Sequence, residues 1–377
     1  MVDPKDFYSI VANKGIEFFT GVPDSLLKPF NSCVSEKSSP ENNIIAANEG
    51  ASAGLAAGYH LATGKIPLIY LQNSGMGNLI NPLLSLADKK VYSIPALIIV
   101  GWRGQPGIKD EPQHIKQGEV TIDLLEAMDM PYYVLEDISK EALDLEMDRI
   151  IKKITSEKCP YFIVVPKGVF SDYKIKSKPE PAFELKREEA VKIIVDQMTD
   201  NDIVVSTTGK TSRELFEYRV ELGQSHENDF LTVGSMGHAS QIALGIALNK
   251  PKLNIYCFDG DGAVLMHMGS LPVIGDLAPK NYFHIVFNNG SHESVGGQPT
   301  VGYNTNFLQI AESSGYKKTF KAITEQDIKS ALQEMKSCDG PVLLEIMINQ
   351  GSRKDLGRPT LTTFENKKNF MNKLRNH

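Results

Sequence analysis

The stretch LNIYCFDGDGAVLMHMGSL spans residues 253–271, and YFHIVFNNGSHESVGG follows at residues 282–297. Each stretch begins with a run of apolar residues that predicts a buried strand. The first run ends at the GDG of 260–262 and the second at the NNG of 288–290. Because the carboxyl ends of parallel strands meet at one edge of a sheet, we expect a carboxylate and an amide to face the same site.

The side chains of Asp261 and Asn289 carry the hard oxygen ligands that Mg²⁺ prefers. The flanking glycines let the backbone approach a phosphate, and the helix expected after 262 offers N–H groups at its start. Alone, GDG or NNG is a common tight turn. Together, at two successive strand ends, they predict a site for Mg²⁺ and a diphosphate.

The rest of the chain alternates between apolar runs and amphipathic segments, a pattern typical of a doubly wound α/β fold with parallel sheets. The further strands are expected at 66–71, 96–100, 161–165, 203–206 and 342–348, and helices at 140–154, 187–198 and 325–335. Residues 171–186 are charged, contain Pro179 and Pro181, and predict a linker. We therefore expect domains at 1–170 and 187–377, and a basic surface helix at 365–377.

Composition narrows the class of protein. The chain has 377 residues, of which 41% are hydrophobic, and its 40 basic and 46 acidic residues give a net charge of −6. This balance argues against nucleic acid as a partner. No apolar run approaches the roughly 20 residues of a membrane span, and the start resembles no secretory leader, so we expect a cytoplasmic protein with no membrane partner.

The four cysteines lie far apart and form no CxxC pair: Cys33, Cys159, Cys257 and Cys338. We expect reduced, buried thiols rather than disulfides or a zinc site.

GDG followed by NN at this spacing resembles the cofactor motif of the thiamin diphosphate-dependent decarboxylase family. The resemblance implies thiamin diphosphate and Mg²⁺ as cofactors, with the metal held by the side chains of Asp261 and Asn289 and the carbonyl of Ser291. It also places Gly260, Gly262 and Ala263 against the cofactor.

The loop TTGKTS at 207–212 follows an expected strand and is a candidate for holding the diphosphate through Thr208, Gly209 and Thr211. It is not a P-loop, because that pattern requires glycine where this chain has Val204. A solvated helix N-cap is the alternative interpretation.

The segment AANEGASAGLAAGYHLATGK at 46–65 resembles the glutamate segment of the same family. The resemblance implies that Glu49 binds the aminopyrimidine ring and activates the cofactor. Alternatively, a carboxylate in a first helical turn only complements the helix dipole. In the family, the pyrimidine-binding domain of one subunit faces the diphosphate-binding domain of its partner. The chain is thus expected to form a homodimer or a dimer of dimers, with 1–170 binding pyrimidine and 187–377 binding diphosphate.

The segment VGSMG at 233–237 resembles the family's pyrimidine loop. By this resemblance Gly234 accepts the 4′-amino hydrogen through its carbonyl, Ser235 lies beside it, and Met236 is an apolar wedge against the cofactor. Core filling is the alternative role for Met236.

The short linker leaves no room for a third domain, as in the phosphonopyruvate and sulfopyruvate decarboxylases. Several segments resemble the phosphonopyruvate group: GVPDS at 21–25, LQNSG at 71–75, GWRG at 101–104, DEPQH at 110–114 and HESVGGQ at 292–298. The resemblance implies decarboxylation of 3-phosphonopyruvate to phosphonoacetaldehyde and CO₂ in phosphonate biosynthesis.

A doubly anionic 2-oxoacid requires cations and hydrogen-bond donors. The candidate substrate-binding residues are Ser25, Gln72, Asn73, Arg103, Lys109, Gln113 and His114, and the candidate acid–base residues are Asp24, His114 and Glu293. The alternatives are a solvated charged loop for Arg103 and Lys109 and a structural histidine for His114. Trp102 either covers the substrate or anchors its loop.

The sequence leaves other functions open. Sulfopyruvate decarboxylase, another 2-oxoacid decarboxylase and a carboligase are the nearest alternatives. A nucleotide-binding α/β oxidoreductase or sensor is a different class, although no GxGxxG follows the first strand.

Overall fold

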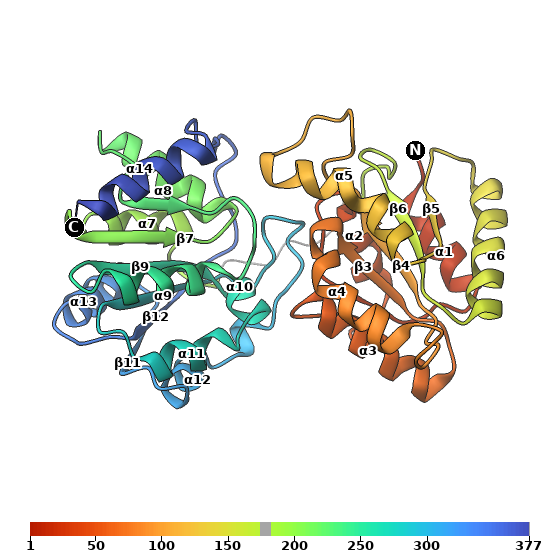
Figure 1. Cartoon of the computed structure of the whole chain (residues 1–377), viewed down its shortest axis with the longest axis horizontal. Helices are drawn as coiled ribbons and strands as arrows, with labels where there is room; N and C mark the ends of the chain where they lie inside the picture. The colour runs from red at the N-terminus through yellow and green to blue at the C-terminus, as the bar shows by residue number, and fades with distance from the viewer. Residues whose placement is uncertain (174–181, 377) are drawn as a thin grey trace. The chain divides into compact units, whose positions relative to one another are not determined.

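The computed structural model describes residues 1–173 and 182–376. The chain divides into two compact units, Met1–Lys178 with Val295–Gln298 and Pro179–Ser294 with Pro299–His377. Each unit contains one six-stranded sheet with helices on both faces (Figure 1). The predicted architecture of two doubly wound parallel sheets is confirmed.

The sheet of the first unit has the strand order β2-β1-β3-β4-β6-β5, and its recorded pairs are parallel. The strands are β1 (Phe19–Gly21), β2 (Asn43–Ile45), β3 (Leu68–Gln72), β4 (Leu97–Gly101), β5 (Tyr132–Val134) and β6 (Tyr161–Val165). The three longer strands are the predicted ones, and β4 and β6 are buried along their whole length. Strands buried on both faces are uniformly apolar, which is why the runs were visible in the sequence.

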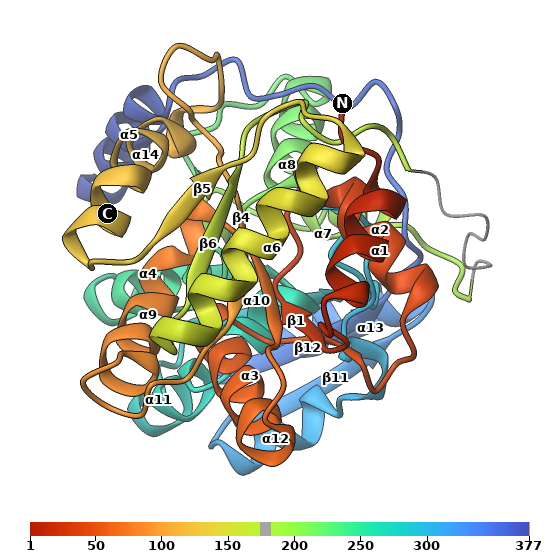
Figure 2. The same ribbon diagram turned by 90° about the vertical axis from the view of Figure 1, so that its right-hand side faces the viewer.

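Two layers of helices cover this sheet. One face packs on α1 (Pro4–Asn13), α2 (Lys28–Lys37) and α6 (Lys140–Glu157), and Figure 2 shows α1 and α6 side by side there. The other face packs on α3 (Glu49–Thr63), α4 (Met76–Pro82) and α5 (Pro112–Ala127). Two short turns complete the unit, a 3₁₀ turn at Asn73–Gly75 and a π turn at Leu83–Ala87.

The sheet of the second unit has the order β11-β12-β10-β9-β7-β8, again with parallel pairs. Its strands are β7 (Asp202–Ser206), β8 (Asp229–Leu231), β9 (Asn254–Gly260), β10 (Tyr282–Asn288), β11 (Lys318–Ala322) and β12 (Val342–Met347). The four predicted runs became β7, β9, β10 and β12. Each forms part of the centre of the sheet, with β8 and β11 as its edges.

The helices of the second unit also form two layers. One core cluster joins the sheet to α7 (Arg187–Val195), α8 (Lys210–Glu221) and α13 (Glu325–Met335). The other joins it to α9 (Ala239–Asn249), α10 (Asp261–Met266), α11 (Ser270–Leu277), α12 (Phe307–Ser313) and α14 (Thr363–Arg375). A 3₁₀ turn lies at Gly302–Asn304.

The predicted C-terminal helix exists as α14, but it is more than a surface helix. The Asn366 side chain donates to the Asp229 carbonyl at 2.8 Å and accepts from the Leu231 N–H at 3.1 Å. Phe370 is buried and packs on Phe230. The helix therefore fastens to the edge strand β8.

Residues 174–181 of the predicted linker lie outside the described residues. The end of that segment belongs to the second unit: Leu185 is buried in its core, and the Asn349 side chain accepts from the Ala182 and Phe183 N–H groups at 2.8 and 2.9 Å. The expectation that all of 171–186 is linker is therefore wrong at its C-terminal end.

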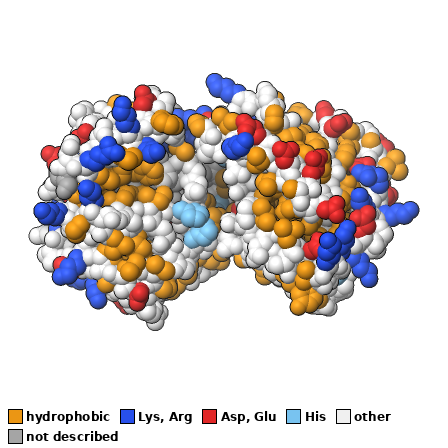
Figure 3. Space-filling view, viewed as in Figure 1, with side chains coloured by type: hydrophobic (Ala, Val, Ile, Leu, Met, Phe, Trp, Pro, Cys, Tyr) orange, Lys and Arg blue, Asp and Glu red, His pale blue; other side chains and the backbone are white. Residues whose placement is uncertain are grey.

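Charged side chains of both signs are scattered over the visible surface of each unit, with hydrophobic side chains between them (Figure 3). Among the described residues, no helix is both long and apolar enough to cross a membrane.

Candidate active site

In each sheet the strand order reverses at one strand: the next two strands along the chain lie on opposite sides of it. In the first unit β2 and β3 flank β1, and in the second β8 and β9 flank β7. Open α/β sheets bind ligands outside the carboxyl ends of the strands at such a point. The loops after β1, β3 and β4, and those after β7, β9 and β10, hold most of the predicted site residues.

Glu49 is the first residue of α3 and is buried. The Asn48 side chain caps this helix by accepting from the Ala51 N–H at 2.9 Å. The Glu49 carboxylate accepts from Asn78 Nδ2 at 2.8 Å, and burial raises its pKa. A Cβ atom built on Gly75 would lie only 2.1 Å from Glu49 Oε1. A carboxyl with a raised pKa is suited to exchanging a proton near neutral pH.

Asp24 lies in the loop after β1 and is fully buried. Its carboxylate accepts from the N–H groups of Leu26 at 3.0 Å and Leu27 at 3.2 Å, and from the Gln72 side chain. Burial raises its pKa, against these hydrogen bonds and the charge of Arg103. The structure thus brings together Asp24, predicted for acid–base chemistry, and Gln72, predicted for substrate binding.

Arg103 is held in one orientation by its neighbours. Its guanidinium makes a two-pronged ion pair with Asp110 and donates to Ser25 Oγ at 2.7 Å. Burial alone would raise the pKa of Asp110, but the hydrogen bonds from Arg103 and from backbone N–H groups hold it well below its usual range. Lys109, in contrast, is exposed. Arg103 is therefore an oriented cation, and Lys109 fits the solvated-loop alternative.

Two side chains, those of Asn73 and Trp102, anchor the loop after β4. Asn73 Nδ2 donates to the Arg103 carbonyl at 2.8 Å and to Thr121 Oγ1 at 2.9 Å, so its side chain supports the loop. Trp102 Nε1 donates to the Gly118 carbonyl at 2.9 Å, and its ring packs on the core. Trp102 thus anchors the loop, which is one of its two predicted roles.

His114 lies in the first turn of α5 and is buried. Burial, and then the charge of Arg103, lower its pKa to about 4, so the imidazole is neutral near pH 7. Its Nδ1 atom and Oε1 of neighbouring Gln113 are buried without a hydrogen-bond partner among the described residues. Unpartnered buried polar atoms are costly in a core and common at ligand sites.

In the second unit Asp261 opens α10 and is 2% exposed. Thr300 Oγ1 and the Asn289 N–H both donate to its carboxylate, the latter at 3.4 Å. Burial raises its pKa to about 6. Nearby Ser291 Oγ is buried and unpartnered within the part of the chain that the structure describes. The desolvated carboxylate contacts the backbone of Asn289, whose side chain carries an amide oxygen, and carboxylate and amide oxygens are the ligands that a divalent cation prefers, so these residues fit Mg²⁺.

Glu293 has a different environment from the one predicted. Its carboxylate accepts from Arg187 at 2.8 Å, Lys210 at 2.9 Å and Asn289 Nδ2 at 3.0 Å. Burial alone would raise its pKa, but Arg187 and Lys210 lower it. A carboxylate held ionised by two cations is a poor proton donor. This environment favours a structural role for Glu293, and its acid–base role stays a prediction.

The hydroxyl loop after β7 is tightly connected. Thr208 Oγ1 donates to the Val233 carbonyl at 2.7 Å, and Ser212 Oγ donates to the Thr207 carbonyl at 2.7 Å. Gly209 has a φ of +97°, which favours glycine, and Thr211 is buried. The first of these bonds joins the predicted diphosphate loop to the predicted pyrimidine loop.

The pyrimidine-loop candidates lie beside the GDG turn. Ser235 adopts a left-handed φ of +55°, and Gly234 and Met236 are partly exposed. A Cβ atom built on Gly262 would lie 3.4 Å from the Met236 methyl carbon, so the two approach closely. Ala263 is buried, and Gly260 ends β9. Met236 is therefore not plain core filler.

The core of the second unit contains a cluster of potential metal ligands. Cys257, Asp259 and His284 are buried with potential metal-ligating atoms within 4.8 Å of one another. His284 Nδ1 also lies 3.1 Å from the Tyr316 hydroxyl. These residues form a polar cluster inside the core, and Cys257 is a reduced thiol as expected.

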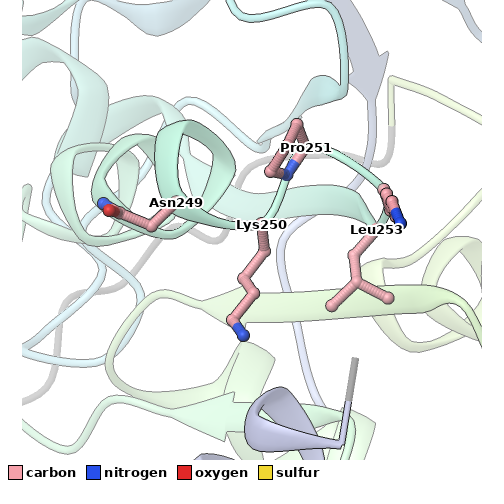
Figure 4. Close-up of a pocket in the computed structure, with 5 residues that line it drawn as sticks. Asn249, Lys250, Pro251 and Leu253 are labelled. Carbon is pink, nitrogen blue, oxygen red and sulfur yellow. The ribbon is translucent and has the colours of Figure 1, made fainter.

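A small pocket of about 140 Å³ is lined by Asn249, Lys250, Pro251, Lys252 and Leu253 (Figure 4). It lies at the start of β9, whereas Asp261 follows the end of that strand. It is therefore at the opposite edge of the sheet from the candidate site.

Comparison with known proteins decides the family. Residues 5–127 match the model described as "Thiamine pyrophosphate enzyme, N-terminal TPP binding domain", and residues 207–346 match the corresponding C-terminal TPP binding domain. Thiamine pyrophosphate is another name for thiamin diphosphate. A phosphonopyruvate decarboxylase of Streptomyces viridochromogenes is 34% identical over 386 residues, which cover 98% of this chain and 94% of the relative. The chain belongs to the thiamin diphosphate-dependent decarboxylases.

Two further relatives of this decarboxylase carry a different substrate in their names. A sulfopyruvate decarboxylase of Methanosarcina acetivorans is 28% identical over 378 residues, with 93% of each chain covered. A sulfopyruvate decarboxylase subunit beta of Methanocaldococcus jannaschii is 39% identical over 155 residues, which cover 40% of this chain and 79% of the relative. The alternative of a nucleotide-binding oxidoreductase or sensor is wrong, because both halves match the thiamin diphosphate enzymes.

Several residues of the decarboxylase that shape these sites were not predicted. They are Asn78 and Gly75 beside Glu49, Thr300 beside Asp261, and Arg187 and Lys210 beside Glu293. Gly75 and Lys210 did stand in segments that the sequence had singled out. The other three had no local signal, since their roles arise from contacts.

Proposed function

We propose that this decarboxylase converts 3-phosphonopyruvate to phosphonoacetaldehyde and CO₂, using thiamin diphosphate and Mg²⁺, as a step in phosphonate biosynthesis. The observation that carries the choice of substrate is the 34% identity to a phosphonopyruvate decarboxylase across nearly all of both chains. The sulfopyruvate relative of comparable coverage is 28% identical, and sulfopyruvate is the second candidate.

The residues of the second unit would hold the metal and the diphosphate. Asp261 and Asn289 offer side-chain oxygens and Ser291 its carbonyl, while Thr208, Gly209 and Thr211 offer hydroxyl and backbone groups. When bound, thiamin diphosphate supplies a nucleophilic carbon and takes up the electrons released as CO₂ departs.

The first unit supplies proton transfer and substrate binding. Glu49 exchanges a proton at its carboxylate, whose raised pKa supports that role. Asp24 is the candidate donor of the proton that the product carbon requires, because burial raises the pKa of its carboxyl. Arg103, oriented by Asp110, offers a planar donor group that suits a phosphonate.

The active form is an assembly of at least two copies of the chain. Helix α3 exposes small and apolar residues on one side, including Gly54, Leu55, Gly58 and Leu61. Figure 3 shows hydrophobic side chains at the surface of the unit that contains this helix. Such a face permits close packing against a second copy. That a relative is named a subunit also supports an assembly.

Two experiments test this function. Thermal unfolding with thiamin diphosphate and Mg²⁺ should show stabilisation that NAD does not produce. Purified enzyme should then turn over phosphonopyruvate with a higher kcat/KM than sulfopyruvate and release phosphonoacetaldehyde. A higher kcat/KM for sulfopyruvate would favour the second candidate, and a carboligated acid as the main product would indicate a carboligase.

A further inference from the structure

The side-chain amide of Asn289 is held in a single orientation. Its Nδ2 donates to Glu293 Oε2 at 3.0 Å, and its Oδ1 accepts from the Ser291 N–H at 3.0 Å. A carboxylate cannot donate and a backbone N–H cannot accept, so exchanging the amide oxygen and nitrogen would break both bonds. The amide oxygen therefore points away from Glu293 and keeps a lone pair for a further partner.

Glu293 is itself fixed and ionised. Arg187 and Lys210 each donate to one of its oxygens, and the Gly351 N–H donates to Oε1 at 3.0 Å. Arg187 is held in turn by two hydrogen bonds to Glu214, at 2.7 and 3.0 Å. Two acidic and two basic groups thus balance in a network that is buried except for the partly exposed Lys210. Such charge-assisted bonds are short and directional, so the carboxylate that meets Asn289 is rigid.

Lys210 has a specific place in this arrangement. It is the first residue of α8, directly after the hydroxyl loop proposed to hold the diphosphate. Its ammonium group is engaged by Glu293 at 2.9 Å. The network therefore links the diphosphate loop to the metal ligand Asn289 through one carboxylate.

We infer that Glu293 is a positioning residue that orients the Asn289 amide so that its oxygen faces the metal. This inference rests on the proposed function, in which Asn289 binds Mg²⁺. Without an acceptor at Glu293, Nδ2 loses its partner and only the hydrogen bond from the Ser291 N–H still orients the amide. The amide then rotates more easily and presents N–H groups, which cannot bind a cation. Loss of such a supporting contact typically weakens metal binding by about 10- to 100-fold.

The test compares Glu293→Met with Glu293→Gln. Both variants remove the same charge from Arg187 and Lys210, but only glutamine keeps an oxygen that can accept from Asn289. Mg²⁺ is titrated into each purified protein at saturating thiamin diphosphate, by calorimetry. We expect Glu293→Met to raise the Kd for Mg²⁺ by about tenfold or more, and Glu293→Gln to stay close to the unaltered protein.

A matched control separates orientation from loss of buried charge. Glu214→Gln removes the other carboxylate of the network without a contact to Asn289, and should leave the Kd for Mg²⁺ close to that of the unaltered protein. If Glu293→Met does not fold, Glu293→Asp keeps the charge but shortens the reach to Asn289, and should weaken Mg²⁺ binding at near-normal thermal stability.

The outcomes are distinguishable. Equal Kd values for the methionine and glutamine variants, or an unchanged Kd in Glu293→Asp, would overturn the positioning role and leave the proposed function intact. If the unaltered protein showed no Mg²⁺-dependent binding of thiamin diphosphate, the proposed function itself would fail.

Discussion

Gly75 leaves the space that the carboxylate of Glu49 occupies, because a Cβ atom at position 75 would lie 2.1 Å from Glu49 Oε1. The two residues are on different elements, the short turn after β3 and the start of α3. The backbone of Gly75 has a φ of −83°, which any residue can adopt. Glycine is therefore needed at this position for the carboxylate and not for the turn.

We expect Gly75→Ala to displace the Glu49 carboxylate while the protein stays folded. Since a misplacement of about 1 Å can cost about 100-fold in rate, kcat should fall by about that factor with little change in melting temperature. Steady-state kinetics and thermal unfolding measure the two effects. Gly77→Ala is the control, because a Cβ there meets no atom within 4 Å, and it should keep full activity. Full turnover in Gly75→Ala would contradict the assigned relation.

Glu49→Gln should retain the cofactor but lose turnover. The amide has nearly the same shape and cannot exchange a proton, so kcat should fall by roughly 10²- to 10⁴-fold. Calorimetry with thiamin diphosphate should give a Kd near that of the unaltered protein. Glu41→Gln, at an exposed position, should behave normally. Near-normal kcat in Glu49→Gln would remove Glu49 from proton transfer.

Asp261→Ala should abolish Mg²⁺-dependent retention of the cofactor, because it removes the buried carboxylate that we assign to the metal. Retention after gel filtration, with and without Mg²⁺, measures the effect. Asp276→Ala changes an exposed carboxylate of α11 and should have no effect. A cofactor affinity unchanged in Asp261→Ala would show that the metal is bound elsewhere.

The pKa of His114 predicts part of the acid sensitivity of the fold. Burial and the nearby Arg103 lower this pKa from 6.5 to about 4. Between these values the unfolded chain binds more protons than the folded one, so stability is lost as pH falls from 6.5 towards 4. His114→Gln should therefore flatten the decrease in melting temperature over this range, compared with the unaltered protein. An identical slope in the two proteins would mean that His114 is protonated alike in both states.

Much of the fold could be predicted because the central strands are buried on both faces and read as continuous apolar runs. Strands β1, β2, β5 and β8 are three residues long, which is too short for any pattern to stand out. Edge strand β11 is partly exposed and lacks such a run. The end of the linker was misjudged because Leu185 is one apolar residue among charged ones, and only its packing places it in the core.

The site was predictable where chemistry and chain order coincide, as at Asp261 and Asn289. The contacts of the site could not be predicted where the partners are distant in sequence. Arg187 and Glu293 are 106 positions apart, and no residue near Glu293 in the sequence indicates that it forms an ion pair. Likewise Asn73 looked like a substrate ligand, yet its amide supports the Arg103 loop. A polar residue in a functional segment has several possible partners, and only the tertiary fold selects among them.

The side chain of Asn366 forms hydrogen bonds with edge strand β8 like those of a paired strand. Its amide donates to the Asp229 carbonyl and accepts from the Leu231 N–H. The outermost strand of a sheet offers its free backbone groups to any other extended chain, which invites aggregation. Helix α14 thus covers part of this edge strand and occupies backbone groups that another chain could otherwise pair with. A chain truncated before Thr363 would keep every candidate active-site residue of both units, but its exposed edge strand would make it prone to aggregate.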